Sequence, residues 1–338
     1  MDNVHLLLVN VWLAFIGLFL VLYVVLDGFD LGIGVLSLFV RENERHGIMV
    51  ASLSSIWDAN ETWLVVLGGA LFGAFPLAYG IALNAFYLPL ITMLFALVFR
   101  GVAFEFREHA KHPRVWTVAF GGGSLVAALC QGLALGGLIE GPKVTDGRFV
   151  GGPFDWLSPF TVLVACGVVF GYVLLGSTYL IIKTEGVQQR RNFRPAWISG
   201  TLMLAAAAAI SIWTPLRYSF VADKWFGHGL LSIFIFPPLF AVVCAVMLAR
   251  GLWKKFEHSP FFWSIGIFLA SFTGLAASLY PFIIPQAVTA MDAAADSMTL
   301  VFMLIGIGML IPVMLAYNAY QYVVFRGKVT DIHYGDQH

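Results

Sequence analysis

The amino-acid sequence predicts an all-α integral membrane protein built from nine transmembrane helices. Hydrophobic residues make up 60% of the 338 residues, charged residues only 11%, and the mean hydropathy is +0.86. A water-soluble domain could not bury that much apolar surface. The apolar runs lack the alternating pattern of a β-barrel, so their backbone amides must be satisfied within helices. Water-soluble folds are therefore excluded.

Nine apolar segments meet the length of about 20 residues that a helix needs to cross a bilayer. The first has about 34 residues, near 51 Å of helix, so it must tilt, kink or protrude from a hydrocarbon core of ~30 Å. Its glycines Gly28, Gly32 and Gly34 would let another helix approach closely. The segments are 6–39, 49–75, 77–100, 115–139, 159–182, 197–216, 229–250, 261–283 and 299–325.

The basic residues predict the orientation, because loops rich in Lys and Arg stay on the cytoplasmic side. With nine spans, fifteen of the 19 Lys and Arg residues fall on one side. The four on the other side are Lys143, Arg148, Arg217 and Lys224. The N-terminus is therefore expected outside and the C-terminus in the cytoplasm.

A faint internal repeat predicts how the chain is organised. Residues 23–33 (YVVLDGFDLGI) and 172–182 (YVLLGSTYLII) share five of eleven positions. An even number of spans in each unit keeps the orientation of the two units equal. We expect two four-helix repeats, a ninth helix and a cytoplasmic tail, with bounds 1–140, 156–284, 296–326 and 327–338.

The overall charge of the chain indicates which kinds of molecule it can bind. Nineteen basic and 19 acidic residues give a formal net charge of zero, so the sequence has no basic footprint for nucleic acid. The three cysteines lie far apart in apolar stretches, which fits neither a disulfide framework nor a metal site. The lipid bilayer is the partner that the composition indicates.

Four acids in the first two segments are the candidate functional residues: Asp27, Asp30, Asp58 and Glu61. Acids at membrane depth are costly and usually face a bundle interior or a hydrated cavity. Asp58 and Glu61 would lie about 14–18 Å from the cytoplasmic end of a continuous second helix. Neighbouring buried carboxyl groups can take up and release protons near neutral pH. A proton relay is one interpretation, and polar contacts that lock the helices together are the other.

The residues around these acids leave both interpretations open. Trp57 and Trp63 flank Asp58 and Glu61, and Asn60 adds an amide donor and acceptor. Arg100 ends the third segment, where it could pair with the acids or snorkel to the cytoplasmic boundary. We therefore group Asn60, Trp57, Trp63 and Arg100 as helix-locking or interface residues.

No metal site is expected in this chain. The eight histidines all fall at segment ends, in loops or in the tail, so none is placed to ligate a haem in the bilayer interior. Asp292 and Asp296 read as solvated loop acids, not metal ligands. The eight histidines are His5, His46, His109, His112, His228, His258, His333 and His338.

Several motifs, in order along the chain, resemble subunit II of the cytochrome bd-type quinol oxidases. They are DGFDLGIG (27–34), WDANETWLVVLGGALFGAFPLAY (57–79), FRGVAFEFR (99–107), GSTYLIIKTEG (176–186) and YPFIIP with DAAA (280–295). The short loop before the ninth segment and the ANETW variant are similar to the cyanide-insensitive branch of that family. Glu61 stands where the family also has glutamine, and Met291 where tryptophan is frequent.

The resemblance implies a haem-free subunit of an enzyme that oxidises quinol and reduces oxygen to water. It implies a subunit I partner that holds haems b and d in a bacterial cytoplasmic membrane. It also implies assembly with that partner and a cytoplasmic proton path through Asp58, with Glu61, Asp27 and Asp30 nearby. It leaves open whether a quinone binds this chain and whether a small single-helix subunit joins the complex.

Without the resemblance, the residues favour a different class of protein. Two helical repeats with Asp27, Asp30, Asp58 and Glu61 as coupling-ion ligands would suit a proton-coupled secondary transporter. Copurification with a haem-bearing polypeptide distinguishes the oxidase from that transporter.

Overall fold

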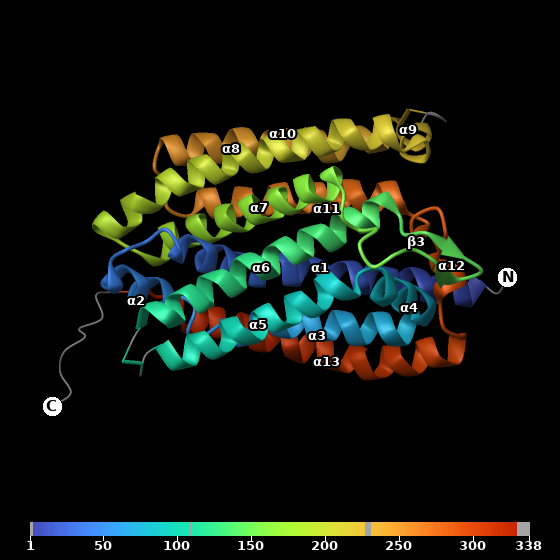
Figure 1. The fold of residues 1–338 in the computed structure, drawn as a ribbon, viewed down its shortest axis with the longest axis horizontal. Helices are drawn as coiled ribbons and strands as arrows, with labels where there is room; N and C mark the ends of the chain where they lie inside the picture. The colour runs from blue at the N-terminus through green and yellow to red at the C-terminus, as the bar shows by residue number, and fades with distance from the viewer. Residues whose placement is uncertain (1–2, 108–109, 112, 227–230, 330–338) are drawn as a thin grey trace.

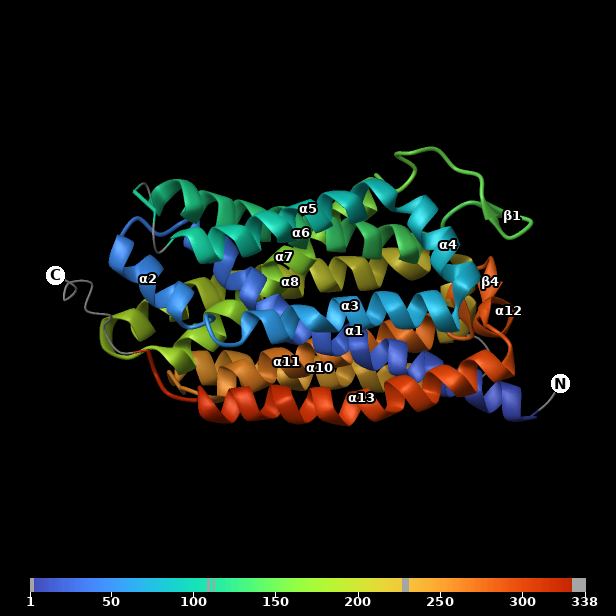
Figure 2. The same cartoon turned by 90° about the horizontal axis from the view of Figure 1, so that it is seen from below.

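The structure is a bundle of long helices that lie roughly along one axis (Figures 1 and 2). It is a computed structural model that describes residues 3–107, 110–111, 113–226 and 231–329, with side chains from 234 in the last range. The helices are α1 (Asn3–Ser37), α2 (Asn43–Ala51), α3 (Trp57–Ala74), α4 (Pro76–Ala85), α5 (Tyr87–Arg107), α6 (Pro113–Glu140), α7 (Pro159–Lys183), α8 (Gly186–Arg217), α9 (Ser219–Phe226), α10 (Leu231–Trp253), α11 (Ser259–Leu279), α12 (Ala290–Ala293) and α13 (Ser297–Val324).

Two short antiparallel ribbons complete the described chain. One pairs β1 (Val144–Thr145) with β2 (Arg148–Phe149), and the other pairs β3 (Phe282–Ile284) with β4 (Val288–Thr289). Both ribbons lie at the end of the bundle where α1 begins, whereas α13 ends at the opposite end (Figures 1 and 2). The fold is helical throughout its core, as the composition predicts.

Eight of the described helices are long and apolar enough to cross a membrane: α1, α5, α6, α7, α8, α10, α11 and α13. The helix that matches the second predicted segment is not among them. α3 has 18 residues and begins with the polar sequence WDANET. The nine spans of the sequence prediction are therefore not confirmed by length and composition.

The single helix predicted over 49–75 is wrong. α2 ends at Ala51 and a turn over 52–56 precedes α3. In this turn the Ser52 hydroxyl donates to the carbonyl of Met49 at 2.7 Å, and the Ser54 hydroxyl to that of Ala51 at 3.1 Å. Serine side chains that bond to nearby carbonyls compete with the helical ladder. Asp58 consequently lies in the first turn of α3 and not 14–18 Å along a continuous helix.

Prolines explain two further differences from the predicted segments. The segment 77–100 divides into α4 and α5, because Pro89 has no N–H and its ring crowds the carbonyl of Ala85. The segment predicted to end at 283 ends at Leu279 instead, since Pro281 cannot continue the helix, and β3 follows.

The core divides around α1, which contacts α3, α6, α7, α11 and α13. One cluster joins the second half of α1 to α5, α6 and α7, with Phe29, Leu97, Phe120 and Leu175 fully or almost fully buried. Another joins the first half of α1 to α3 and α13. The indole N–H of Trp12 in α1 also donates to the Leu300 carbonyl of α13 at 3.1 Å. α1 is thus the central element that positions the acidic residues.

Asp296 caps the N-terminus of α13. Its carboxylate accepts the N–H groups of Met298 at 3.0 Å and Thr299 at 3.1 Å, and the Thr299 hydroxyl at 2.7 Å. These hydrogen bonds lower the pKa of Asp296, and the bond from the Thr299 hydroxyl has the largest effect. Asp292 makes a similar capping contact with Thr289 at α12. Both acids therefore have structural partners.

The cap predicts a pH-dependent contribution to stability. A carboxyl group whose pKa is lower in the folded than in the unfolded state stabilises the fold above the unfolded value of about 4. That contribution disappears as the pH falls through the folded-state pKa. The melting temperature of an Asp296→Asn variant should therefore lie below that of the wild type at pH 6, and the gap should shrink below pH about 4. A gap of constant size down to pH 3 would contradict this.

Candidate functional site

A buried ion pair joins α1 to α5. Arg100 of α5 is 2% exposed, and its Nη2 atom lies 2.7 Å from Oδ1 of Asp27 and 4.0 Å from Oδ2 of Asp30. Both aspartates are fully buried on one face of α1, three residues apart. Buried charges are tolerated when they are paired. Arg100 therefore joins α5 to α1, and it does not snorkel to a boundary.

Asn60 extends this cluster to two more helices. Its Nδ2 group donates to Oδ2 of Asp30 at 2.9 Å and to the Leu26 carbonyl at 3.3 Å. Its Oδ1 atom accepts the hydroxyl hydrogen of Tyr322 at 2.9 Å. Asn60 is fully buried on α3, and Tyr322 belongs to α13. One asparagine thus connects α1, α3 and α13.

A second set of polar contacts crosses from α1 to α6 and α7. Gln131 donates to the Tyr23 hydroxyl at 2.7 Å and accepts the Tyr172 hydroxyl hydrogen at 2.6 Å. Tyr23 precedes Asp27 by one helical turn, so the two side chains share a face. These three residues are not among the candidates that the sequence predicts. A glutamine inside an apolar segment was the available signal, whereas tyrosines in such segments look like packing residues.

The acids of α3 differ from those of α1 in their exposure. Asp58 is exposed and Glu61 is partly buried. Glu61 interacts electrostatically with Arg100, Asp27 and Asp58. The four predicted acids therefore form a graded series from an exposed carboxyl to two buried ones. The structure brings Glu61, Asp27 and Asp30 around Arg100 and leaves Asp58 at the surface of the chain.

The two tryptophans beside these acids pack in different places. Trp63 is fully buried and stacks on Phe19 of α1 at a ring distance of 6.0 Å. Trp57 is partly buried and lies 5.4 Å from the ring of Phe104 on α5. The pair therefore anchors α3 to α1 on one side and to α5 on the other.

Two of the described histidines have hydrogen-bond partners within the chain. His5 bonds to Ser297, and Nε2 of His46 lies 2.8 Å from the Val40 carbonyl. Burial lowers the pKa of His46, which favours the neutral ring. Within the described ranges no group of three His, Cys, Asp or Glu side chains could hold a metal. His109, His112, His228, His333 and His338 lie outside those ranges.

Comparison with known proteins identifies relatives along nearly the whole chain. The chain is 28% identical over 365 residues to "Cytochrome bd-I ubiquinol oxidase subunit 2" of Escherichia coli K12, covering 95% of this chain and 94% of that one. It is 29% identical over 336 residues to "Cytochrome bd ubiquinol oxidase subunit 2" of Bacillus subtilis 168, covering 95% and 96%. Both relatives are named as second subunits of ubiquinol oxidases.

A solved structure shares the fold. A chain of the bd oxidase from Geobacillus thermodenitrificans superposes with a TM-score of 0.76, at 16% sequence identity, over 94% of this chain and 98% of that one. Residues 8–325 match the family described as "Cytochrome bd terminal oxidase subunit II". The chain belongs to the cytochrome bd terminal oxidase subunit II family.

Proposed function

We propose that this chain is the haem-free subunit II of a bd-type quinol oxidase in a bacterial cytoplasmic membrane. The observation that carries the proposal is the family match over residues 8–325. The partner is a subunit I that holds haems b and d, and the complex oxidises quinol and reduces oxygen to water. A separate proton-coupled transporter is not favoured, because the relatives are oxidase subunits.

We place nine helices across the membrane, with the N-terminus outside and the C-terminus in the cytoplasm. α3 is the ninth, beside the eight long apolar helices, and it packs against α1 and α13. The excess of Lys and Arg on one side supports the orientation. Most of the cytoplasmic tail, residues 330–338, lies outside the described residues.

We also propose that the chain contains two four-helix repeats, 1–140 and 156–284, followed by the ninth helix over 296–326. The two similar segments, 23–33 and 172–182, belong to α1 and α7, which pack directly against each other. A Cβ atom on Gly32 would lie 1.7 Å from the Tyr172 carbonyl oxygen, and one on Gly176 would lie 2.6 Å from the Ile33 nitrogen. This reciprocal contact is what two related helices around a pseudo-two-fold axis would make.

In the proposed mechanism the acids of this chain carry protons toward the oxygen-reducing site of the partner. Reduction of oxygen to water consumes protons, and the partner's haems supply the electron transfer. Asp58 is the exposed carboxyl that receives a proton, and Glu61 lies between Asp58 and the buried pair. The positive charge of the Arg100 guanidinium balances only one of the two carboxylates, Asp27 and Asp30. The three groups together are therefore neutral when one of the two carboxyl groups is protonated. The cluster of Asp27, Asp30 and Arg100 is therefore suited to hold one proton at a time.

Replacing Asp58 tests this function. An Asp58→Asn variant of the purified complex should consume oxygen at least about tenfold more slowly, because an amide cannot pass on the proton. The haem absorption spectrum should stay unchanged, since the partner binds the haems. An Asp155→Asn variant, in the loop between α6 and α7, is the matched control and should keep the wild-type rate.

The same preparations separate the function from its alternatives. Unchanged oxygen consumption in Asp58→Asn would rule out Asp58 as a proton relay. Copurification without any haem-bearing polypeptide would contradict the oxidase itself. Analysis of the purified complex would also identify a bound quinone or a small single-helix accessory subunit.

A further inference from the structure

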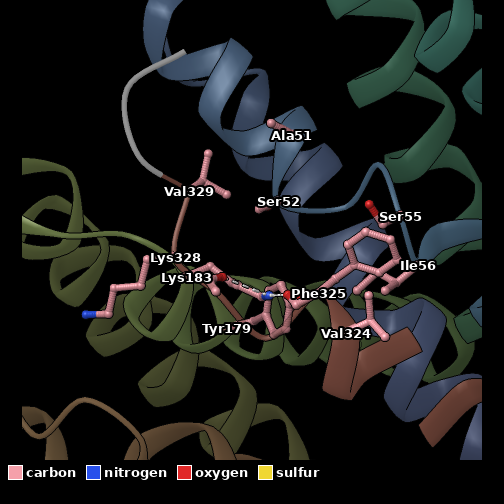
Figure 3. A pocket seen from close by; sticks show the side chains of 11 residues that line it. Ala51, Ser52, Ser55, Ile56, Tyr179, Lys183, Val324, Phe325, Lys328 and Val329 are labelled. Carbon is pink, nitrogen blue, oxygen red and sulfur yellow. Dashed lines mark hydrogen bonds between the residues drawn. The ribbon is translucent and has the colours of Figure 1, made fainter. Parts of the chain in front are cut away.

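A pocket of about 300 Å³ opens at the end of the bundle where α13 ends (Figure 3). Its walls come from the turn before α3, the end of α7, and the end of α13 with the segment that follows it. Ser52, Ser55, Tyr179 and Lys183 supply its polar side chains, beside Lys328. A volume of this size holds several water molecules, each of which takes about 30 Å³ in the liquid.

Tyr179 connects this pocket to the buried carboxylates. Its ring lines the pocket and stacks on Phe29 of α1 with ring centroids 4.2 Å apart. The residue is 4% exposed, and its hydroxyl makes no hydrogen bond with another described residue. Phe29 is the residue directly before Asp30. The stack therefore places the tyrosine ring against the residue that precedes Asp30 on α1.

Asp30 has a complementary unpaired atom. Its Oδ2 atom accepts from Asn60, whereas Oδ1 is fully buried and makes no hydrogen bond with a described residue. Tyr179 and Asp30 interact electrostatically. Buried polar groups nearly always find a partner, and polar groups near each other without direct contact are commonly bridged by water. A single water molecule between the Tyr179 hydroxyl and Oδ1 of Asp30 would give both groups a hydrogen-bond partner.

The charges of the pocket do not favour an anion. Lys183 donates to the carbonyl of Phe325 and, at 3.2 Å, to that of Gly327, which occupies its ammonium group. Lys328 pairs with Glu257 at 2.6 Å and Glu185 at 3.6 Å, and its side chain extends away from the other lining residues (Figure 3). Carboxylates therefore neutralise the charge of Lys328, whereas the Lys183 ammonium keeps its charge but already donates to two backbone carbonyls. Water is the ligand that suits the remaining hydroxyl groups.

We propose that this pocket is a water entrance through which protons reach Asp30, with the Tyr179 hydroxyl as the relay. The inference rests on the proposed function, and it adds a route that does not pass Asp58. A hydronium ion in the pocket gives its proton to the Tyr179 oxygen while the tyrosine proton moves, through a bridging water, to Oδ1 of Asp30. Water remains in the pocket, the tyrosine ends neutral, and the carboxylate becomes a carboxylic acid.

The groups that face Asp30 are consistent with this transfer. Arg100 of α5 and Asp27 of α1 complete the charge cluster, and Glu61 of α3 interacts electrostatically with Asp30. Tyr322 of α13 interacts electrostatically with both Asp30 and Tyr179, but its hydroxyl hydrogen is donated to Asn60. Tyr179 is thus the hydroxyl left free to move a proton.

The test uses the purified complex with a soluble quinol as the electron donor. A Tyr179→Phe variant keeps the ring on Phe29 and removes only the hydroxyl. Oxygen consumption should fall, and it should fall further in the Tyr179→Phe/Asp58→Asn double variant, because Asp58 leaves a parallel route open. The solvent deuterium isotope effect should rise. The infrared band of the protonated Asp30 carboxyl, assigned as the band missing in Asp30→Asn, should form more slowly. The matched control is Tyr317→Phe, an exposed tyrosine of α13, which should match the wild type.

The outcomes separate the entrance from the function on which it rests. If oxygen consumption is slow in Asp30→Asn but remains at the wild-type rate in Tyr179→Phe, the entrance is overturned and the proposed function stands. Full rates in both Asp30→Asn and Asp58→Asn would overturn the proton role in the proposed function, whereas copurification without a haem-bearing polypeptide would overturn the oxidase assignment. If Tyr179→Phe gives too little complex, Ser55→Phe fills the pocket from the turn before α3. A wild-type rate in Ser55→Phe would also overturn the entrance.

Discussion

Replacing Arg100 by methionine is expected to prevent stable assembly of the complex. Arg100 is the guanidinium group that lies against two fully buried aspartates, at 2.7 Å from Asp27 and 4.0 Å from Asp30. Removing one partner of a buried ion pair leaves an uncompensated charge and costs about 3–5 kcal/mol of folding free energy. That is a large part of the stability of an ordinary domain. The melting temperature and the yield of the purified complex both measure the loss.

Two further variants test the reason for that loss. Arg100→Met combined with Asp27→Asn removes a charge of each sign, so we expect it to recover much of the stability of Arg100→Met. Arg114→Met, at an exposed position in the first turn of α6, should behave as the wild type. Normal yield of Arg100→Met, or no recovery in the double variant, would contradict the charge argument.

A methyl group at Gly32 is expected to force α1 and α7 apart. The added Cβ atom would lie 1.7 Å from the Tyr172 carbonyl oxygen and 2.4 Å from its carbonyl carbon. Both are backbone atoms, so no side-chain rotation can relieve the overlap. Overpacking of this kind costs about 3 kcal/mol. The buried cluster should also suffer, because Asp27 and Asp30 lie on the same helix.

A second glycine provides the control for Gly32→Ala. Gly122 is also in a helix interior, on α6, and a Cβ atom there meets nothing within 4 Å. Gly122→Ala should keep or slightly raise the melting temperature, since alanine favours helix by up to about 1 kcal/mol. Equal melting temperatures of Gly32→Ala and Gly122→Ala would rule out the close contact between α1 and α7.

The helices were predictable from sequence because each apolar segment is long and uniform. The breaks between helices were less predictable. Ser52 and Ser54 interrupt the second segment by bonding to carbonyls, a local contact that hydropathy does not register. Pro89 was a visible signal for the break after α4, but prolines also occur inside α8, α10 and α13. Hydropathy predicts that a segment is helical, and hydrogen-bond competition decides where the helix ends.

The site was predictable residue by residue but not as an arrangement. Acids in apolar segments are conspicuous, so Asp27, Asp30, Asp58 and Glu61 were found. Their unequal burial was not predictable, because it depends on where α3 begins and on which face of α3 meets α1. Arg100 lay open between two interpretations, since its distance from Asp27 follows only from how α5 packs on α1. The relay through Tyr179 required a pocket formed by three distant parts of the chain.

The turn over 52–56 has a consequence for the surrounding lipid. At 1.5 Å per residue, α3 spans about 27 Å, and the stretch after its polar first turns covers only about 20 Å. A hydrocarbon core of ~30 Å does not match that length. Hydrophobic mismatch of this size is met by thinning of the bilayer or by contact with another protein. In the proposed nine-helix arrangement, the side of the chain that carries Asp58 therefore suits a polypeptide neighbour better than acyl chains, and the unassembled chain should indent the membrane there.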